Sequence, residues 1–117
     1  MKKIYYLSTC NTCTRIINEL NLPKGFLLQD IKTEPITEDQ IEAMRARTDS
    51  YESLFSKRAR LYKELGLKEK SLSDDDLKNY ILEHYTFLKR PVVLYNNQIF
   101  IGNSKKIVAA AKLAIDE

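Results

Sequence analysis

The feature that most constrains the fold of this chain is a short strand pattern that leads into two cysteines and then into a helix pattern. Ile4–Leu7 is an apolar run rich in β-forming residues, which predicts a short buried strand over 3–7. Apolar residues then recur at helical spacing, which predicts a helix over 11–21. Cys10 and Cys13, the only two cysteines, lie at the junction. The sequence therefore predicts a C-x-x-C pair at a strand-to-helix turn.

The position of these cysteines predicts a reactive thiol. A helix N-terminus presents N–H groups without helical partners and the positive end of the helix dipole. A cysteine at that end has a stabilised thiolate and a lowered pKa, and we expect Cys10 to cap the helix in this way. Cys13 would then lie one turn further on and face Cys10, while Arg15 adds positive charge. One thiolate could attack a substrate and the other could resolve the mixed disulfide.

The composition narrows the class of protein and its partners. Of the 117 residues, 44% are hydrophobic and 30% are charged, so we expect a single globular domain over 1–117 with a real core. The net charge of +3 is too small to argue for binding to nucleic acid or to a membrane surface. No apolar run approaches the ~20 residues of a membrane span. We therefore expect no direct nucleic-acid or membrane contact.

The first residues and the cysteine content bear on the cellular compartment. Met1-Lys2-Lys3 is basic, but the apolar stretch after it is too short for a signal peptide. We expect the protein to stay in the cytoplasm, where thiols are kept mostly reduced. In that compartment a C-x-x-C pair indicates redox chemistry or a metal site rather than a structural disulfide.

The rest of the chain completes an α/β pattern. Residues 26–31 form a second apolar run of strand length, so the first two strands and their helix make a parallel βαβ unit. Helix patterns then fill about 37–87. Strand-like runs at 92–95 and 98–101 are separated by two asparagines and predict a hairpin, because asparagine tolerates the positive φ of such a turn. Helical spacing from Ile107 predicts a final helix.

The helical segment carries clear start and stop signals. Thr37 and Ser73 each precede an acidic first turn and are predicted to cap helices, the first with a capping box. Gly66 is predicted to stop a helix that follows a basic cluster. His84, the only histidine, is expected on the apolar face of the helix that begins after Ser73, so we interpret it as structural.

This order predicts a thioredoxin-like α/β fold. The elements run β-α-β, then a helical insertion at about 37–87, then β-β-α, with the C-x-x-C pair at the first strand-to-helix turn. Pro91 opens the third strand. In thioredoxin-like folds a proline at this place, often in cis, lies against the redox cysteine, so we predict a cis peptide bond at Pro91.

Several local patterns together resemble a known family over essentially the whole chain. They are the strand ending in Cys10, Leu65-Gly66 after Tyr62, the acid-capped helix ending in His84, the run Leu88-Lys89-Arg90-Pro91-Val92-Val93, and the late Gly102. In order and spacing they resemble the arsenate reductase family of the glutaredoxin-linked type, which also contains the Spx transcriptional regulators.

The resemblance implies roles for individual residues. Cys10 matches the nucleophilic cysteine, and Arg90 matches the arginine that precedes the proline near it. Arg58 resembles the arginine set four residues before Tyr62 in members with an arginine-rich turn. Cys13 matches the second cysteine of the C-x-x-C switch in Spx.

The sequence departs from the arsenate reductases at two positions. Thr14 stands where those enzymes have an arginine after the cysteine, and Arg15 comes one residue later. Gly102 stands where they have a further active-site arginine, and in this it is similar to Spx and to glutathione-linked members. Both departures concern the binding of an anion rather than the chemistry of the thiol.

Two functions follow from the resemblance. The first is a thiol-dependent reductase with no bound cofactor, in which glutathione or glutaredoxin supplies electrons and Cys13 or glutathione resolves. Helix N–H groups at Asn11 and Thr12, with Arg15, Arg58 and Arg90, would hold a small oxyanion or the carboxylates of glutathione. The second is an Spx-like regulator that binds RNA polymerase and is switched by a Cys10–Cys13 disulfide.

Plainer interpretations stay open for each of these residues. The cysteines could be buried structural thiols, or half of a zinc site, although no second Cys or His pair completes four ligands. We therefore expect no metal. Arg90 could be a surface charge, and Lys57, Arg58 and Arg60 could be a solvated basic helix face.

Overall fold

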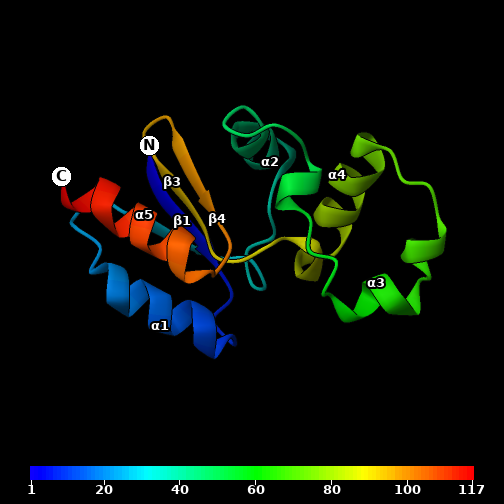
Figure 1. Cartoon of the computed structure of the whole chain (residues 1–117), viewed down its shortest axis with the longest axis horizontal. Coiled ribbons are helices and arrows are strands. Elements are labelled where there is room, and N and C mark those ends of the chain that lie inside the picture. Colours follow the sequence, from blue (N-terminus) through cyan, green and yellow to red (C-terminus); the bar gives the residue numbers. More distant parts are fainter. The chain divides into compact units, whose positions relative to one another are not determined.

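The structure is a computed structural model that describes all residues from 1 to 117. It groups into two compact units (Figure 1). The sheet unit consists of Met1–Glu34 and Arg90–Glu117, and the helical unit consists of Pro35–Lys89. The helical insertion expected at about 37–87 corresponds to the helical unit. That the whole chain forms one domain stays a prediction.

The sheet unit contains a four-stranded sheet in the order β2-β1-β3-β4. β1 is parallel to β2 and antiparallel to β3, and β3 is antiparallel to β4. The predicted βαβ unit and hairpin are thereby confirmed. The elements of this unit are β1 (Lys2–Tyr6), α1 (Asn11–Leu20), β2 (Leu27–Asp30), β3 (Val92–Tyr95), β4 (Gln98–Ile101) and α5 (Lys105–Asp116).

One apolar core joins the sheet to both helices of this unit. α1 and α5 lie side by side on one face of the sheet (Figure 1). Ile4 of β1 and Val93 of β3 are register partners, and both belong to this core. The helices contribute Ile16 and Leu20 from α1, and Val108, Ala111 and Ile115 from α5. This packing fixes α1, and with it the cysteine-bearing N-terminus, against the sheet.

Left-handed residues set two boundaries of the sheet unit. α1 ends at Leu20, one residue earlier than expected, because Asn21 adopts φ 49° and ψ 61°. In the hairpin between β3 and β4, Asn96 has φ 56° while Asn97 keeps a negative φ. Asparagine therefore makes this turn as predicted, with one left-handed residue rather than two.

The helical unit is built from short helices with well-formed caps. Its α-helices are α2 (Glu38–Arg45), α3 (Arg60–Glu64) and α4 (Asp74–Glu83), and its 3₁₀ turns are η1 (Glu52–Leu54), η2 (Leu67–Glu69) and η3 (Tyr85–Phe87). Thr37 and Ser73 both form complete capping boxes, with Gln40 and Asp76 as their partners. Gly66, at φ 65°, follows α3 as predicted. None of the helices in the structure has the length and apolar character that crossing a membrane requires.

The interpretation of His84 needs a correction. The sequence placed it on the apolar face of a helix, but α4 ends at Glu83 and His84 is its C-cap, with extended backbone at φ −136°. The imidazole packs edge-on against Phe87, with 5.8 Å between ring centroids. The helix stops here because the 3₁₀ turn η3 begins directly after His84. A structural role for this histidine agrees with the ring contact.

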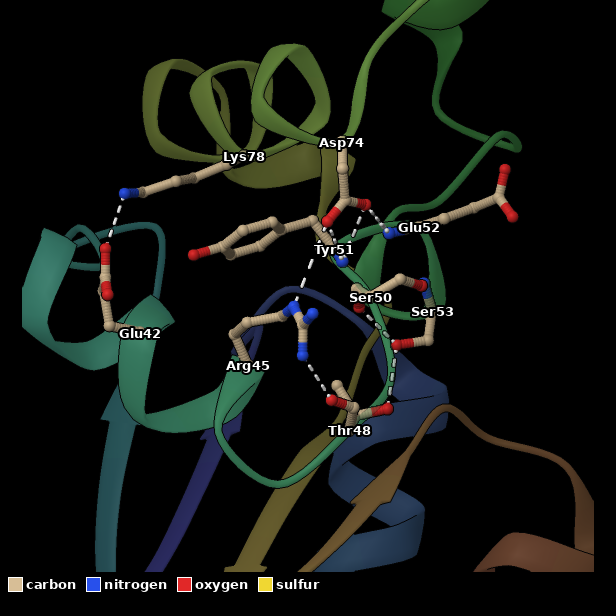
Figure 2. A network of polar contacts seen from close by, with 9 residues as sticks. All are labelled: Glu42, Arg45, Thr48, Ser50, Tyr51, Glu52, Ser53, Asp74 and Lys78. Atoms are coloured by element: carbon tan, nitrogen blue, oxygen red, sulfur yellow. Dashed lines mark hydrogen bonds and ion pairs between the residues drawn. The ribbon is translucent and has the colours of Figure 1, made fainter.

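A polar network holds the segment after α2 to the start of α4 (Figure 2). The Asp74 carboxylate accepts hydrogen bonds from the N–H groups of Tyr51, at 3.0 and 3.2 Å, and of Glu52, at 3.3 Å. The Arg45 guanidinium lies 3.9 Å from the same carboxylate. Lys78 of α4 donates to Glu42 of α2 at 2.7 Å. Asp74 therefore satisfies backbone donors that no helical carbonyl reaches.

We predict that Asp74→Ala lowers the free energy of unfolding by about 1 kcal/mol, because it removes charge-assisted hydrogen bonds to two backbone N–H groups at a half-exposed site. Urea denaturation followed by circular dichroism measures the change. Asp75→Ala is the matched control, since Asp75 is the next residue in the first turn of α4 and has none of these contacts. Equal losses in the two variants would contradict the assignment, because both remove the same favourable charge from the helix N-terminus.

Candidate thiol site

The two cysteines lie where β1 turns into α1. Cys10 is the N-cap of α1, with extended backbone at φ −98° and ψ 111°, and its N–H donates to the carbonyl of Leu7 at 3.0 Å. Cys13 is the third residue of the helix and is fully buried, whereas Cys10 is partly exposed. Both are free thiols. The structure thus presents one accessible thiol at the helix end and one enclosed thiol a turn behind it. The C-x-x-C spacing predicts the separation by one turn, but not the difference in burial.

The surroundings of Cys10 favour its thiolate. Partial burial opposes ionisation, but it is outweighed by the N–H and the S–H of Cys13, the N–H of Thr12 and the positive charge of Arg90, so the pKa of Cys10 falls below its ordinary value. No regular cap hydrogen bond reaches the Cys10 side chain. The stabilisation is therefore that of N–H dipoles directed at a developing negative charge.

The surroundings of Cys13 have the opposite effect. Burial is the largest cause, and together with the neighbouring Cys10 thiolate it raises the pKa of Cys13 to about 11. The N–H of Leu7 and the charge of Arg90 oppose this rise without cancelling it. At neutral pH Cys13 is therefore a neutral thiol. The two thiols therefore differ in kind: Cys10 is suited to attack, and Cys13 to donate a proton or to react second.

Arg90, which precedes Pro91 in the sheet unit, acts on both cysteines through its charge. The half-buried Arg90 exerts a favourable charge effect on both thiolates. The sequence predicts a cis bond before Pro91, and the Arg90–Pro91 peptide bond of the structure is cis. A catalytic role for Arg90 stays a prediction. Its positive charge stabilises both thiolates, as such a role requires.

The remaining predicted anion ligands fall into two groups. Asn11 and Thr12 are the first two residues of α1, and Arg15 lies exposed within the same helix. Arg58 belongs to the helical unit, in the exposed turn before α3. The structure brings Asn11 and Thr12 to the same helix end as Cys10. The contribution of each of the four to anion binding stays a prediction.

Sequence reasoning missed two anchors of this site. The Leu7 backbone serves both cysteines, since its carbonyl accepts from the Cys10 N–H and its N–H favours the Cys13 thiolate. The Asp30 carboxylate, at the end of β2, binds Ser8 in the loop before Cys10. The parallel pairing of the first two strands was the available signal for Asp30, because the carboxyl ends of parallel strands meet at one edge of the sheet.

We predict that the two thiols differ strongly in alkylation rate. In Cys13→Ser, the rate at Cys10 should titrate below the reference thiol pKa of about 8.5, because the helix N–H groups and Arg90 stabilise its thiolate. In Cys10→Ser, Cys13 should react slowly and titrate above that reference, because burial opposes ionisation even without the Cys10 charge. Stopped-flow alkylation across pH measures both. Equal profiles for the two single-cysteine proteins would contradict the assignment.

All the candidate site residues lie in the part of the chain that one protein-family model matches. A family model described as ArsC family matches residues 5–111. The global transcriptional regulator Spx of Bacillus subtilis is 26% identical over 106 residues, which are 87% of this chain and 79% of that protein. An arsenate reductase of Yersinia enterocolitica is 30% identical over 95 residues, 78% of this chain and 66% of the reductase. The chain thus spans about two thirds of that enzyme's length.

A solved structure supports the fold. The arsenate reductase from Vibrio cholerae superposes with a TM-score of 0.70 at 24% identity, covering 97% of this chain and 96% of that one. This likeness concerns the fold alone. With the observed strand order, it confirms the predicted thioredoxin-like α/β fold with a helical insertion between its two halves.

Proposed function

Because this chain belongs to the ArsC family, we propose that it is a thiol-dependent oxidoreductase in which the Cys10 thiolate is the nucleophile and a small oxyanion or a disulfide is the substrate. The observation that carries the proposal is the contrast between the two thiols. The pKa of Cys10 is lowered at a helix N-terminus, while the pKa of Cys13, directly behind it, is raised to about 11. A buried structural pair would give no reason for one thiol to be activated and partly exposed.

The first step with arsenate as substrate is a displacement at arsenic. The Cys10 thiolate attacks the arsenic(V) atom, a sulfur–arsenic bond forms, and one arsenate oxygen leaves as water after protonation. The N–H groups at the start of α1 would hold the remaining oxygens, and Arg90 would supply positive charge beside them. No electrons are transferred in this step.

The second step transfers two electrons. A second thiolate attacks the Cys10 sulfur, a sulfur–sulfur bond forms, and the sulfur–arsenic bond breaks with its electron pair remaining on arsenic. The products are arsenite and a disulfide, so two thiols are oxidised while arsenic(V) is reduced to arsenic(III). The second thiol would be Cys13 or glutathione.

The raised pKa of Cys13 is compatible with this second role. Part of the rise comes from the Cys10 thiolate, both through its charge and through the hydrogen bond between the two side chains. Once the Cys10 sulfur is bonded to arsenic, the charge on that sulfur and its hydrogen bond to Cys13 are lost, and these two contributions to the raised pKa of Cys13 are lost with them. The N–H of Leu7 and the charge of Arg90 then favour a Cys13 thiolate. Cys13 would thus ionise more readily after the first step than before it, although burial still keeps its pKa above the ordinary thiol value.

Regeneration requires an external reductant. We propose glutathione or glutaredoxin as the electron donor, in the cytoplasm where glutathione keeps thiols reduced. Two glutathione thiols would reduce the Cys10–Cys13 disulfide and leave as glutathione disulfide. The α1 N-terminus and Arg90 would suit a carboxylate of glutathione as well as an oxyanion.

Thr14 and Gly102 stand where the arsenate reductases have arginines. Because of these two differences, a small oxyanion and a disulfide both stay candidate substrates. Thr14, in place of an arginine, donates its hydroxyl to the carbonyl of Cys10 at 3.3 Å and offers no positive charge. Gly102 has φ 95°, a conformation in which a side chain would be strained, and its N–H donates to the carbonyl of Pro91 at 2.9 Å.

A second candidate function is favoured by a specific observation. The Bacillus subtilis relative is named a transcriptional regulator and aligns over 87% of this chain, and the C-x-x-C pair matches the switch expected of Spx. In this alternative, oxidation of Cys10 and Cys13 to a disulfide would change the affinity for RNA polymerase. The same activated Cys10 would serve as the sensor rather than as a catalyst.

We predict arsenate-dependent consumption of NADPH when the protein is coupled to glutathione, glutaredoxin and glutathione reductase. Cys10→Ser should abolish turnover, because the attacking sulfur is lost. Cys13→Ser should keep part of it, because glutathione can resolve. Arg90→Met should lower kcat/KM more than Arg90→Lys, which keeps the charge. A low-molecular-weight disulfide in place of arsenate distinguishes the two substrate classes.

Two outcomes would count against the proposed enzyme. Consumption that is unchanged in Cys10→Ser would contradict the enzyme. Absence of turnover with either substrate, together with binding to RNA polymerase that differs between the oxidised and reduced protein, would favour the regulator.

A further inference from the structure

An acid at the end of β2 ties down the loop that carries the reactive cysteine. The Asp30 carboxylate accepts the hydroxyl of Ser8 at 2.5 Å through Oδ2 and the backbone N–H of Ser8 at 3.4 Å through Oδ1. Oδ1 also accepts the N–H of Lys32 at 3.2 Å. One side chain therefore joins the segment after β1 to the segment after β2. The Ser8 hydroxyl bond is short, as expected of a charge-assisted hydrogen bond.

The sheet places Asp30 where it can do this. Tyr6 and Asp30 are register partners at the carboxyl ends of the parallel strands β1 and β2. Beyond them the N–H of Ile31 still donates to the carbonyl of Tyr6 at 2.9 Å. Ser8 lies two residues past Tyr6, outside the ladder, and donates its N–H and its hydroxyl to the Asp30 carboxylate instead. The carboxylate thus extends the pairing of the strands into the loop.

This loop sets the geometry of both thiols. Leu7, next to Ser8, accepts the N–H of Cys10 at 3.0 Å, and its own N–H favours the Cys13 thiolate. Thr9 alone separates Ser8 from Cys10. Movement of Ser8 would therefore move the Cys10 sulfur relative to the N–H groups at the start of α1.

Asp30 acts through Ser8 rather than through its charge. It is not among the main causes of either thiol's pKa shift, whereas Arg90 contributes to both. Its own pKa is lowered, first by the Ser8 hydroxyl and then, against slight burial, by the N–H groups of Lys32 and Ser8. Asp30 is therefore ionised across the whole pH range in which a thiol titrates.

We propose that Asp30 is a positioning residue for the Cys10 thiol, which it holds in register with the N-terminus of α1 by binding Ser8. This inference rests on the proposed function, in which the Cys10 thiolate is the reacting group. On this proposal, Asp30 of β2 contributes to the activation of Cys10 by keeping its sulfur close to the N–H groups at the start of α1.

The test is the pH profile of Cys10 alkylation in a Cys13→Ser background, with Ser8→Ala and Asp30→Ala compared with the unaltered loop. We expect Ser8→Ala, which leaves every charge in place, to raise the apparent pKa of Cys10 by about half a unit. The rate at pH 7 should then fall about twofold, since a more basic thiolate is also a better nucleophile. Asp30→Ala should shift the pKa in the same direction and further.

The sign of the shift separates the possible roles. Removing a nearby negative charge would by itself lower the pKa of Cys10, so a fall in Asp30→Ala would show a charge effect and overturn the proposal. No shift in Ser8→Ala would overturn it as well. Glu34→Ala is the matched control, since it removes the same charge from the same segment but its side chain accepts no hydrogen bond from the loop. It should leave the profile unchanged.

The proposed function and this inference fail in different ways. An ordinary pKa for Cys10 in the unaltered loop would count against the enzyme and the sensor alike. The difference between the variants and that reference decides the role of Asp30 whatever the reference value is. Because Ser8 is exposed, Ser8→Ala is expected to fold, and it decides the question even if Asp30→Ala does not.

Discussion

The site depends on one interaction, the alignment of backbone N–H groups at the start of α1 with the sulfur of Cys10. It stabilises a negative charge with backbone dipoles, and it exists only while α1 keeps its place on the sheet. That place is secured by Ile16 and Leu20, which pack in the same core as Ile4 and Val93. The stabilisation of the Cys10 thiolate therefore depends on the packing of the apolar face of α1 against the sheet.

The difference between the thiols follows from where they lie on one helical turn. Cys10 at the cap faces water and the N–H groups, while Cys13, three residues on, faces the core. Burial gives Cys13 the high pKa that keeps it a neutral thiol, and its S–H can then donate to the Cys10 thiolate. The same arrangement would serve a reductase or a regulator, and the relatives of this chain include one protein named arsenate reductase and one named transcriptional regulator.

Local patterns predicted the parts of this structure that depend on neighbouring residues. The C-x-x-C turn, the capping boxes at Thr37 and Ser73 and the asparagine hairpin each follow from a few adjacent positions. His84 was misplaced because its end of α4 is fixed by the 3₁₀ turn after it, which periodicity does not reveal. The Asp30–Ser8 contact joins residues 22 positions apart, and only the register of β1 and β2 brings them together.

The most direct test of the central claim is to identify which sulfur reacts first. The reduced protein would be mixed with glutathione disulfide, quenched with acid at short times, and the peptide 4–15, which contains both cysteines, sequenced by tandem mass spectrometry. We predict that glutathione appears first on Cys10 and is then replaced by a Cys10–Cys13 disulfide. Glutathione found first on Cys13, or on neither cysteine, would contradict the account.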